Sequence, residues 1–134
     1  MKLMIVDDHR GMREMLKSFF CSPEDEATFC PDGVEALATY RQCRPDWVLM
    51  DLAMKELDGI TATRQIRIEF PEARVIMVTE HDNPRLREMA RQAGACAFVA
   101  KDNLAEARQI MQLDRSGPVP PVPPGSPSTP DFIL

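Results

Sequence analysis

The sequence has no closely spaced pair of cysteines, no long apolar run and no excess of positive charge. Its four cysteines stand far apart. Without a C-x-x-C pair, neither a zinc site nor a thioredoxin-like redox site is expected. Scattered cysteines in an ordinary composition are typical of a reducing compartment. We therefore expect all of them to behave as small hydrophobic side chains: Cys21, Cys30, Cys43 and Cys96.

No apolar run approaches the length of about 20 residues that a membrane-spanning helix needs. The opening residues, MKLMIVDD, reach two aspartates too early for a secretory signal. A net charge of −5 and a pI near 5.0 are unlike the basic surface of a dedicated nucleic-acid-binding protein. These features predict a cytoplasmic protein that binds neither membrane nor nucleic acid directly.

The chain divides into a globular part, residues 1–113, and a proline-rich tail, residues 114–134. The tail holds most of the 12 prolines of the sequence. Such a segment cannot form a helix and has little to bury, so we predict that it is disordered or extended. It has no place for a DNA-recognition helix. The chain is thus either a stand-alone domain or a piece of a longer protein.

Within residues 1–113, short apolar runs alternate with helical patterns. The runs predict strands at 3–6, 27–30, 47–50, 75–78 and 97–100. Helical spacing marks five apolar faces: Met12, Met15, Leu16 and Phe19; Val34, Leu37 and Ala38; a segment from Asp58-Gly59 to about Phe70; Leu86, Met89, Ala90 and Ala93; and Leu104, Ala107, Ile110 and Met111. This alternation predicts an α/β fold of the flavodoxin-like (βα)5 kind. Its doubly wound parallel sheet should have the strand order 2-1-3-4-5.

Charged and polar residues follow the apolar runs at one edge of this sheet. The first strand ends in Asp7 and Asp8 and the third in Asp51; the fourth ends in Thr79 and the fifth in Lys101. In such folds, sites form outside the carboxyl ends of the strands. Three neighbouring carboxylates repel one another unless a cation joins them, and Mg²⁺ prefers oxygen ligands. This edge therefore favours Mg²⁺-dependent phosphoryl transfer, with an aspartate as the nucleophile and Lys101 beside the phosphate.

These residues resemble the receiver domain of bacterial two-component response regulators, and the resemblance covers residues 1–113. It rests on Asp7-Asp8, Asp51 followed by LAM, Asp58-Gly59, Thr79 and Lys101. The resemblance implies that Asp51 accepts a phosphoryl group from a sensor histidine kinase or a phosphotransfer protein. It implies a module that promotes its own phosphorylation and autodephosphorylation without being a turnover enzyme.

The resemblance also assigns roles around Asp51. It implies that Asp8 and Asp51 bind Mg²⁺ directly, that Asp7 helps through water, and that the main-chain carbonyl of Ala53 is a further ligand. Thr79 and Lys101 would contact the phosphoryl group. Phe98 occupies the position of the family's aromatic switch residue, and phosphorylation would draw its ring inward.

The sequence departs from the family pattern at three places. Met54 is followed by Lys55 where proline is usual, and Asp102 replaces the proline that commonly follows the lysine in a cis peptide. A cis bond at Asp102 is therefore not expected. Glu80, in place of a small residue after Thr79, puts another carboxylate near the phosphate. His9 and His81 flank the site, and we expect both to be loop residues because Mg²⁺ prefers oxygen.

Two other functions compete with this interpretation. A phosphatase of the haloacid-dehalogenase kind needs a second aspartate two residues after its nucleophile, and Ala53 stands there. A pseudo-receiver would bind partners without phosphorylation, although the complete set of five polar residues argues against it. Output would pass to an unknown protein or through a phosphorylation-dependent homodimer. The fourth helix would offer a basic exposed side made of Arg85, Arg87 and Arg91.

Overall fold

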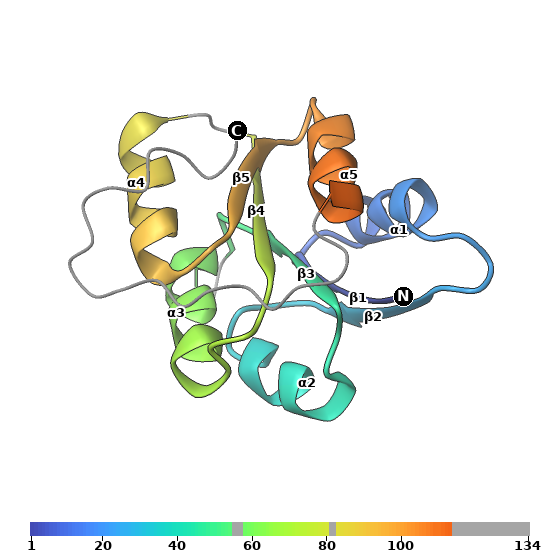
Figure 1. Cartoon of the computed structure of the whole chain (residues 1–134), viewed down its shortest axis with the longest axis horizontal. Coiled ribbons are helices and arrows are strands. Elements are labelled where there is room, and N and C mark those ends of the chain that lie inside the picture. Colours follow the sequence, from blue (N-terminus) through green and yellow to red (C-terminus); the bar gives the residue numbers. More distant parts are fainter. Residues whose placement is uncertain (55–57, 81–82, 114–134) are drawn as a thin grey trace.

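The computed structural model describes residues 1–54, 58–80 and 83–113 of the chain. Five strands alternate with five helices (Figure 1). The strands are β1 (Lys2–Val6), β2 (Glu26–Cys30), β3 (Trp47–Asp51), β4 (Val75–Thr79) and β5 (Ala97–Ala100). The helices are α1 (Arg10–Phe20), α2 (Ala36–Cys43), α3 (Gly59–Glu69), α4 (Pro84–Ala93) and α5 (Leu104–Leu113). The predicted tail, residues 114–134, lies outside the described residues.

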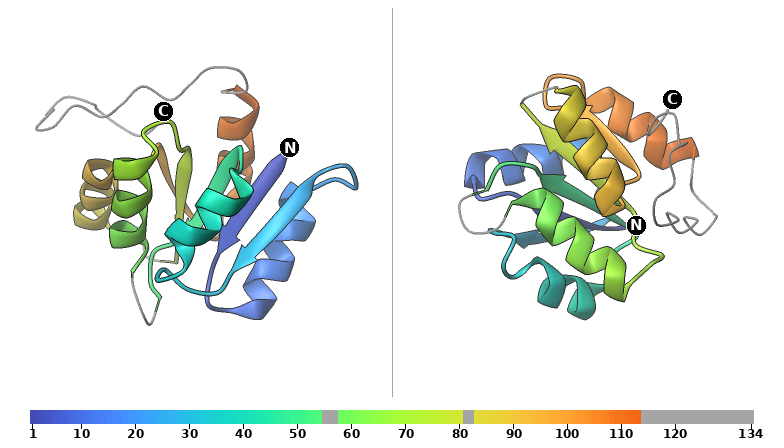
Figure 2. Two further views of the ribbon diagram at one scale, coloured as in Figure 1. Left: turned by 90° about the horizontal axis from the view of Figure 1, so that it is seen from below. Right: turned by 90° about the vertical axis from the view of Figure 1, so that its left-hand side faces the viewer.

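All five strands are parallel, and their order is β2-β1-β3-β4-β5, as the sequence predicted. Helices cover both faces of the sheet: α1 and α5 lie on one face, and α2, α3 and α4 on the other (Figures 1 and 2). Two apolar clusters fill the two interfaces. Alternate residues of β1 enter opposite clusters, Met4 one and Ile5 the other, because side chains alternate along a strand.

The burial of β3 and β4 explains why their sequences are almost continuously apolar. Every residue of β3 and β4 is buried, as expected for strands covered on both faces. This burial includes Asp51 and Thr79, which the sequence placed at the ends of these strands and which are their last residues in the structure. Two polar side chains therefore end strands that are otherwise apolar.

Local signals set where α3 and α4 begin. The side chain of Asp58 accepts a hydrogen bond from the Thr61 amide at the start of α3. Asn83 does the same for α4, accepting from the Arg85 and Leu86 amides, and Pro84 occupies the first helical turn. These contacts satisfy amides that have no partner within the helix. Both helices begin close to the carboxyl ends of the strands before them.

The predicted helix faces are partly wrong. Met15, Val34 and Met89 are 39%, 60% and 40% exposed, and Ala38 is exposed as well. The residues that pack inward instead include Phe20 in α1 and Tyr40 in α2. A short helix contains several sets of residues with helical spacing, and the spacing alone does not say which set faces the sheet.

The prediction of a basic exposed side on α4 is also wrong. Arg91 is only 7% exposed, and its guanidinium pairs with Glu88 at 2.6 Å. Arg87 is half-buried, with its guanidinium carbon 5.0 Å from the centre of the Phe98 ring. Long arginine side chains can lie along apolar surface, so their positions in a sequence do not establish an exposed charge. Only Arg85 of the three is exposed.

Two absences concern the described residues alone. No helix there is long and apolar enough to cross a lipid bilayer. The four cysteines are free thiols, one buried and three half-buried, and none joins a cluster able to hold a metal ion.

Candidate functional site at the carboxyl edge of the sheet

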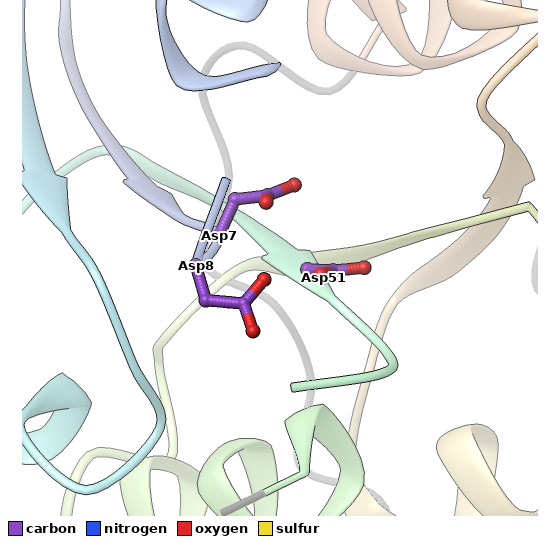
Figure 3. Close-up of side chains that lie close together, drawn as sticks. All are labelled: Asp7, Asp8 and Asp51. Atoms are coloured by element: carbon purple, nitrogen blue, oxygen red, sulfur yellow. The ribbon is translucent and has the colours of Figure 1, made fainter. Parts of the chain in front are cut away.

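Three carboxylates meet where β1 and β3 end. Asp7 and Asp8 directly follow β1, and Asp51 is the last residue of β3. Each offers an oxygen within 4.8 Å of the others, which is close enough for one metal ion (Figure 3). Asp7 and Asp51 are 1% and 6% exposed, whereas Asp8 is exposed. The strand pairing of β1 with β3 therefore creates the cluster from residues far apart in the sequence.

The backbone around Asp51 is fixed on both sides. Asp51 pairs in register with Val78, and the next amide, that of Leu52, donates to the Val78 carbonyl at 3.2 Å. The Gly59 amide then donates to the Leu52 carbonyl at 2.9 Å. A side-chain carbon at Gly59 would lie 2.1 Å from the Asp51 carbonyl oxygen, so only glycine lets α3 begin this close to the strand.

Asp7 is held by hydrogen bonds to its backbone and its side chain. Its amide donates to the Cys30 carbonyl at 3.1 Å and extends the pairing with β2. Its Oδ1 accepts from the His9 amide at 2.8 Å, and its carbonyl accepts from Arg13 Nη1 at 2.8 Å. Asp7 Oδ2 remains directed toward the side chain of Lys101.

Lys101 joins the buried carboxylates from the other side of the site. Its Nζ lies 3.4 Å from Asp7 Oδ2 and 3.4 Å from Asp51 Oδ1. The Lys101 amide donates to the Thr79 carbonyl at 2.7 Å, which holds these two residues side by side. The peptide bond to Asp102 is trans, as expected, since the described residues contain no cis peptide.

Burial and charge shift two pKa values in the site. Burial, and then the negative charge of Asp7, raises the pKa of Asp51 to about 6, although Lys101 acts in the opposite direction. Burial lowers the pKa of Lys101, but the carboxylates of Asp51 and Asp7 outweigh it and leave that pKa raised. Lys101 is thus a permanent cation at neutral pH. A second cation beside the carboxylates would favour the ionised form of Asp51.

A cavity of about 260 Å³ opens above these groups. Each residue predicted for the metal or the phosphoryl group lines it: Asp7, Asp8, Asp51, Ala53, Thr79 and Lys101. Glu80 and His9, which the sequence placed beside the site, line it too. Lys55 and His81 were also placed near the site, and they lie outside the described residues.

Two contacts were not predicted from the sequence. Met12 lines the cavity, and Arg13 supports Asp7 through its carbonyl. Both come from the first turn of α1, and nothing in their spacing separates them from ordinary helix residues. Phe98 is not a lining residue. Its ring belongs to the apolar cluster beneath α2, α3 and α4 and is 2% exposed, so it is already directed inward.

The carboxylates and the ammonium group of this cavity can bind a cation and an anion side by side. Three oxygen donors suit a hard divalent cation, and the space above them leaves room for further oxygen ligands. The Lys101 ammonium beside Asp51 provides positive charge for an anion bound in the same cavity. The cavity, which Asp51 lines, therefore suits a cation and a phosphoryl group together.

Comparisons with known proteins agree with this geometry. The family model for the response regulator receiver domain matches residues 3–112. A transcriptional regulatory protein of Bacillus subtilis, YhcZ, is 37% identical over 116 residues, which cover 82% of this chain and 54% of that protein. The chain thus spans about half the length of the curated relatives it matches.

Solved structures give the same result. A LuxR-family two-component response regulator from Aurantimonas is 34% identical, with a TM-score of 0.78, and the match covers 84% of this chain and 82% of that one. A second structure is the CheX-CheY complex of Borrelia burgdorferi with BeF3 and Mg²⁺. It is 28% identical, with a TM-score of 0.71, and the match covers 84% of this chain and 87% of that one.

Proposed function

Because the chain belongs to the family of response regulator receiver domains, we propose that it accepts a phosphoryl group on Asp51 in two-component signalling. The observation that carries this proposal is the pairing of Asp51 with Lys101 at 3.4 Å, inside a cavity with two more carboxylates. Receiver domains are signalling modules, not turnover enzymes. The reaction is therefore a modification of the chain itself.

The residues present fit Mg²⁺. We propose that Asp8 and Asp51 are its direct side-chain ligands, that Asp7 acts through water, and that the Ala53 carbonyl completes the protein ligands. A bound divalent cation would supply charge neutralisation for the carboxylates and for the phosphoryl oxygens. The raised pKa of Asp51 supports this assignment, since a site that disfavours a lone carboxylate charge is a site that gains from a cation.

Within this proposal, an Asp51 oxygen attacks the phosphorus of the donor. A phosphorus–oxygen bond forms as the bond to the leaving group breaks, and the product is an acyl phosphate. Lys101 Nζ and the Thr79 hydroxyl contact the phosphoryl oxygens. Positioning and charge stabilisation are most of what phosphoryl transfer requires, so hydrolysis by water could proceed in the same cavity as autodephosphorylation.

The donor would be a sensor histidine kinase or a histidine phosphotransfer protein in the cytoplasm. We propose no direct nucleic-acid contact for this chain, because its net charge is −5. Output would pass by protein–protein contact to a downstream protein or to a second copy of the chain in a phosphorylation-dependent homodimer.

The output surface proposed here is the face formed by α4, β5 and α5. A charge-assisted hydrogen bond from Thr79 to the phosphoryl group contributes about 1.5–3 kcal/mol, which changes a two-state ratio roughly ten- to a hundred-fold. Phe98 is already buried under Arg87, so phosphorylation would stabilise this inward ring and the adjoining end of α4. The role of Phe98 as a switch remains a prediction.

Acetyl phosphate with and without Mg²⁺ tests the proposal. Intact mass should rise by one phosphoryl group when both are present, and the added mass should be lost in hydroxylamine. Asp8→Asn should lower the yield at a given Mg²⁺ concentration. A chain that gains no mass with any small phosphodonor, yet still binds partners, would be a pseudo-receiver.

A further inference from the structure

Asp8 is the carboxylate of the acidic site that the protein holds least directly. It is exposed, and among the described residues no hydrogen bond fixes its side chain. It nevertheless offers an oxygen within 4.8 Å of oxygens of Asp7 and Asp51 (Figure 3). Those two carboxylates are buried, and each lies 3.4 Å from Lys101 Nζ. The position of Asp8 must therefore be set by the backbone on either side of it.

Arg13 binds this backbone on both sides of Asp8. Its Nη1 donates to the Asp7 carbonyl at 2.8 Å, and this carbonyl belongs to the peptide that joins Asp7 to Asp8. The Arg13 amide donates to the carbonyl of His9, the residue after Asp8, at 3.1 Å. Any residue at position 13 could make the amide contact, whereas the contact with Asp7 requires a long side chain that carries a donor.

The surroundings of Arg13 hold its guanidinium in place. The guanidinium carbon lies 5.8 Å from the centre of the Phe29 ring on β2, within the range of a cation–π contact. Arg13 is half-buried, and its buried Nε has no hydrogen-bond partner among the described residues. A buried donor without a partner costs stability, so stability alone does not favour an arginine at this position. A fixed guanidinium does, however, hold the Asp7 carbonyl in one orientation.

We propose that Arg13 is a positioning residue for cation binding, which keeps Asp8 close to the other two carboxylates. This role rests on the proposed Mg²⁺ site and adds to it a residue that does not itself contact the cation. Without the hydrogen bond to the Asp7 carbonyl, the peptide between Asp7 and Asp8 is free to rotate, and rotation moves the Asp8 carboxylate. Groups that orient metal ligands typically change the metal affinity ten- to a hundred-fold when they are removed.

The positive charge of Arg13 acts on cation binding in the opposite direction. A guanidinium near a cation site repels the cation, so loss of the charge alone should strengthen binding. Loss of the hydrogen bond to the Asp7 carbonyl should weaken binding. The sign of the change in Mg²⁺ affinity therefore separates the two effects.

Isothermal titration calorimetry of the full chain with Mg²⁺ measures this sign. Arg13→Met keeps an unbranched apolar side chain beside Phe29 and removes the donors, and we expect its dissociation constant to rise at least ten-fold. Arg13→Lys retains a donor and should recover part of the affinity. The matched control is Arg10→Met, because Arg10 is exposed and begins the same helix. This control should bind Mg²⁺ at least as tightly as the wild type.

The Asp8 amide signal in a ¹⁵N–¹H spectrum reports on the hydrogen bond without any cation. This amide belongs to the same peptide group as the Asp7 carbonyl, so its signal should shift further in Arg13→Met than in Arg10→Met. Cooperative unfolding in urea establishes that each variant is folded. If Arg13→Met is not folded, Arg13→Leu, which also lacks donors, takes its place.

The possible results separate this role from the proposed function. Equal Mg²⁺ affinity in the wild type and Arg13→Met would overturn the positioning role and leave the proposed function intact. Equal weakening in Arg10→Met would also overturn the role, because it would not depend on the hydrogen bond to Asp7. Weaker binding by Arg13→Met with an unshifted Asp8 amide would mean that Arg13 does not act through this peptide, which contradicts the role. A wild-type chain that does not bind Mg²⁺ would overturn the proposed function and the positioning role together.

Discussion

Lys101 Nζ lies 3.4 Å from Asp51 Oδ1, at the ends of two strands that are not neighbours in the sheet. The β4 strand separates them, and its last residue, Thr79, is hydrogen-bonded through its carbonyl to the Lys101 amide. Lys101 also reaches Asp7 at 3.4 Å. One ammonium thus connects strands β1, β3 and β5, and it offsets part of the repulsion between their carboxylates.

Removal of this ammonium should affect both charge and chemistry. In Lys101→Met, the positive charge that lowers the pKa of Asp51 is lost, so this pKa should rise above about 6. Phosphorylation by acetyl phosphate should slow by about a hundred-fold, the usual effect of removing one transition-state contact. Lys2→Met, at the far end of β1, is a matched control that should keep the wild-type rate. An unchanged rate in Lys101→Met would mean that Lys101 does not contact the phosphoryl group.

The raised pKa of Asp51 predicts a pH dependence of stability. A carboxyl group whose pKa rises on folding, here from 3.8 to about 6, favours the folded state while protonated and loses this advantage as pH rises. Near pH 7 and without divalent cations, the ionised Asp51 lowers the free energy of unfolding by about 3 kcal/mol. Asp51→Asn should therefore be more stable than the wild type to urea at neutral pH. The difference should shrink toward pH 4, and a difference independent of pH would contradict this origin.

Cation binding should follow the same titration. Because metal ligands must be deprotonated, the affinity for Mg²⁺ should fall as the pH drops below about 6, where Asp51 takes up its proton. Isothermal titration calorimetry at several pH values measures this change. Asp8→Asn should bind more weakly throughout, and Asp46→Asn, at the opposite edge of the sheet, should bind like the wild type. Equal affinity at pH 5 and pH 7 would exclude Asp51 as a ligand.

Beryllofluoride, a mimic of the phosphoryl group, should change the face formed by α4, β5 and α5. Because Phe98 is already buried beneath Arg87, we expect slower amide exchange in β5 and at the start of α4, with no new burial of the ring. Arg87→Gln removes the guanidinium over the ring and should speed exchange in β5 before the mimic is added. If the changes remain confined to the residues around Asp51, the chain accepts phosphate without altering this face.

The fold could be predicted from the sequence because β3 and β4 are buried on both sides and read as continuous apolar runs. Parallel pairing then brings the residues after these runs to one edge, whatever their separation in the chain. For this reason the sequence predicts that Asp7, Asp51, Thr79 and Lys101 form one group. Their roles around the phosphoryl group came from the family resemblance and still await experiment.

Other features depend on packing that the sequence does not record. The closeness of Gly59 to the Asp51 carbonyl follows from the angle at which α3 begins. Arg91 and Arg87 appeared to be surface charges, yet one is buried beside Glu88 and the other covers Phe98. Helical spacing likewise suggested that Met15 faced the core, and the structure leaves it 39% exposed. In each case, packing against a neighbouring helix or strand determines the position or the exposure of the residue.

Intact mass spectrometry after incubation with acetyl phosphate and Mg²⁺ tests the assignment of Asp51 most directly. The wild-type chain should gain one phosphoryl group, and Asp51→Asn should gain none. Asp102→Asn, an exposed carboxylate next to Lys101, serves as the matched control and should gain one group like the wild type. A phosphoryl group retained by Asp51→Asn with the same lability to hydroxylamine would place the acceptor on another carboxylate and contradict the account.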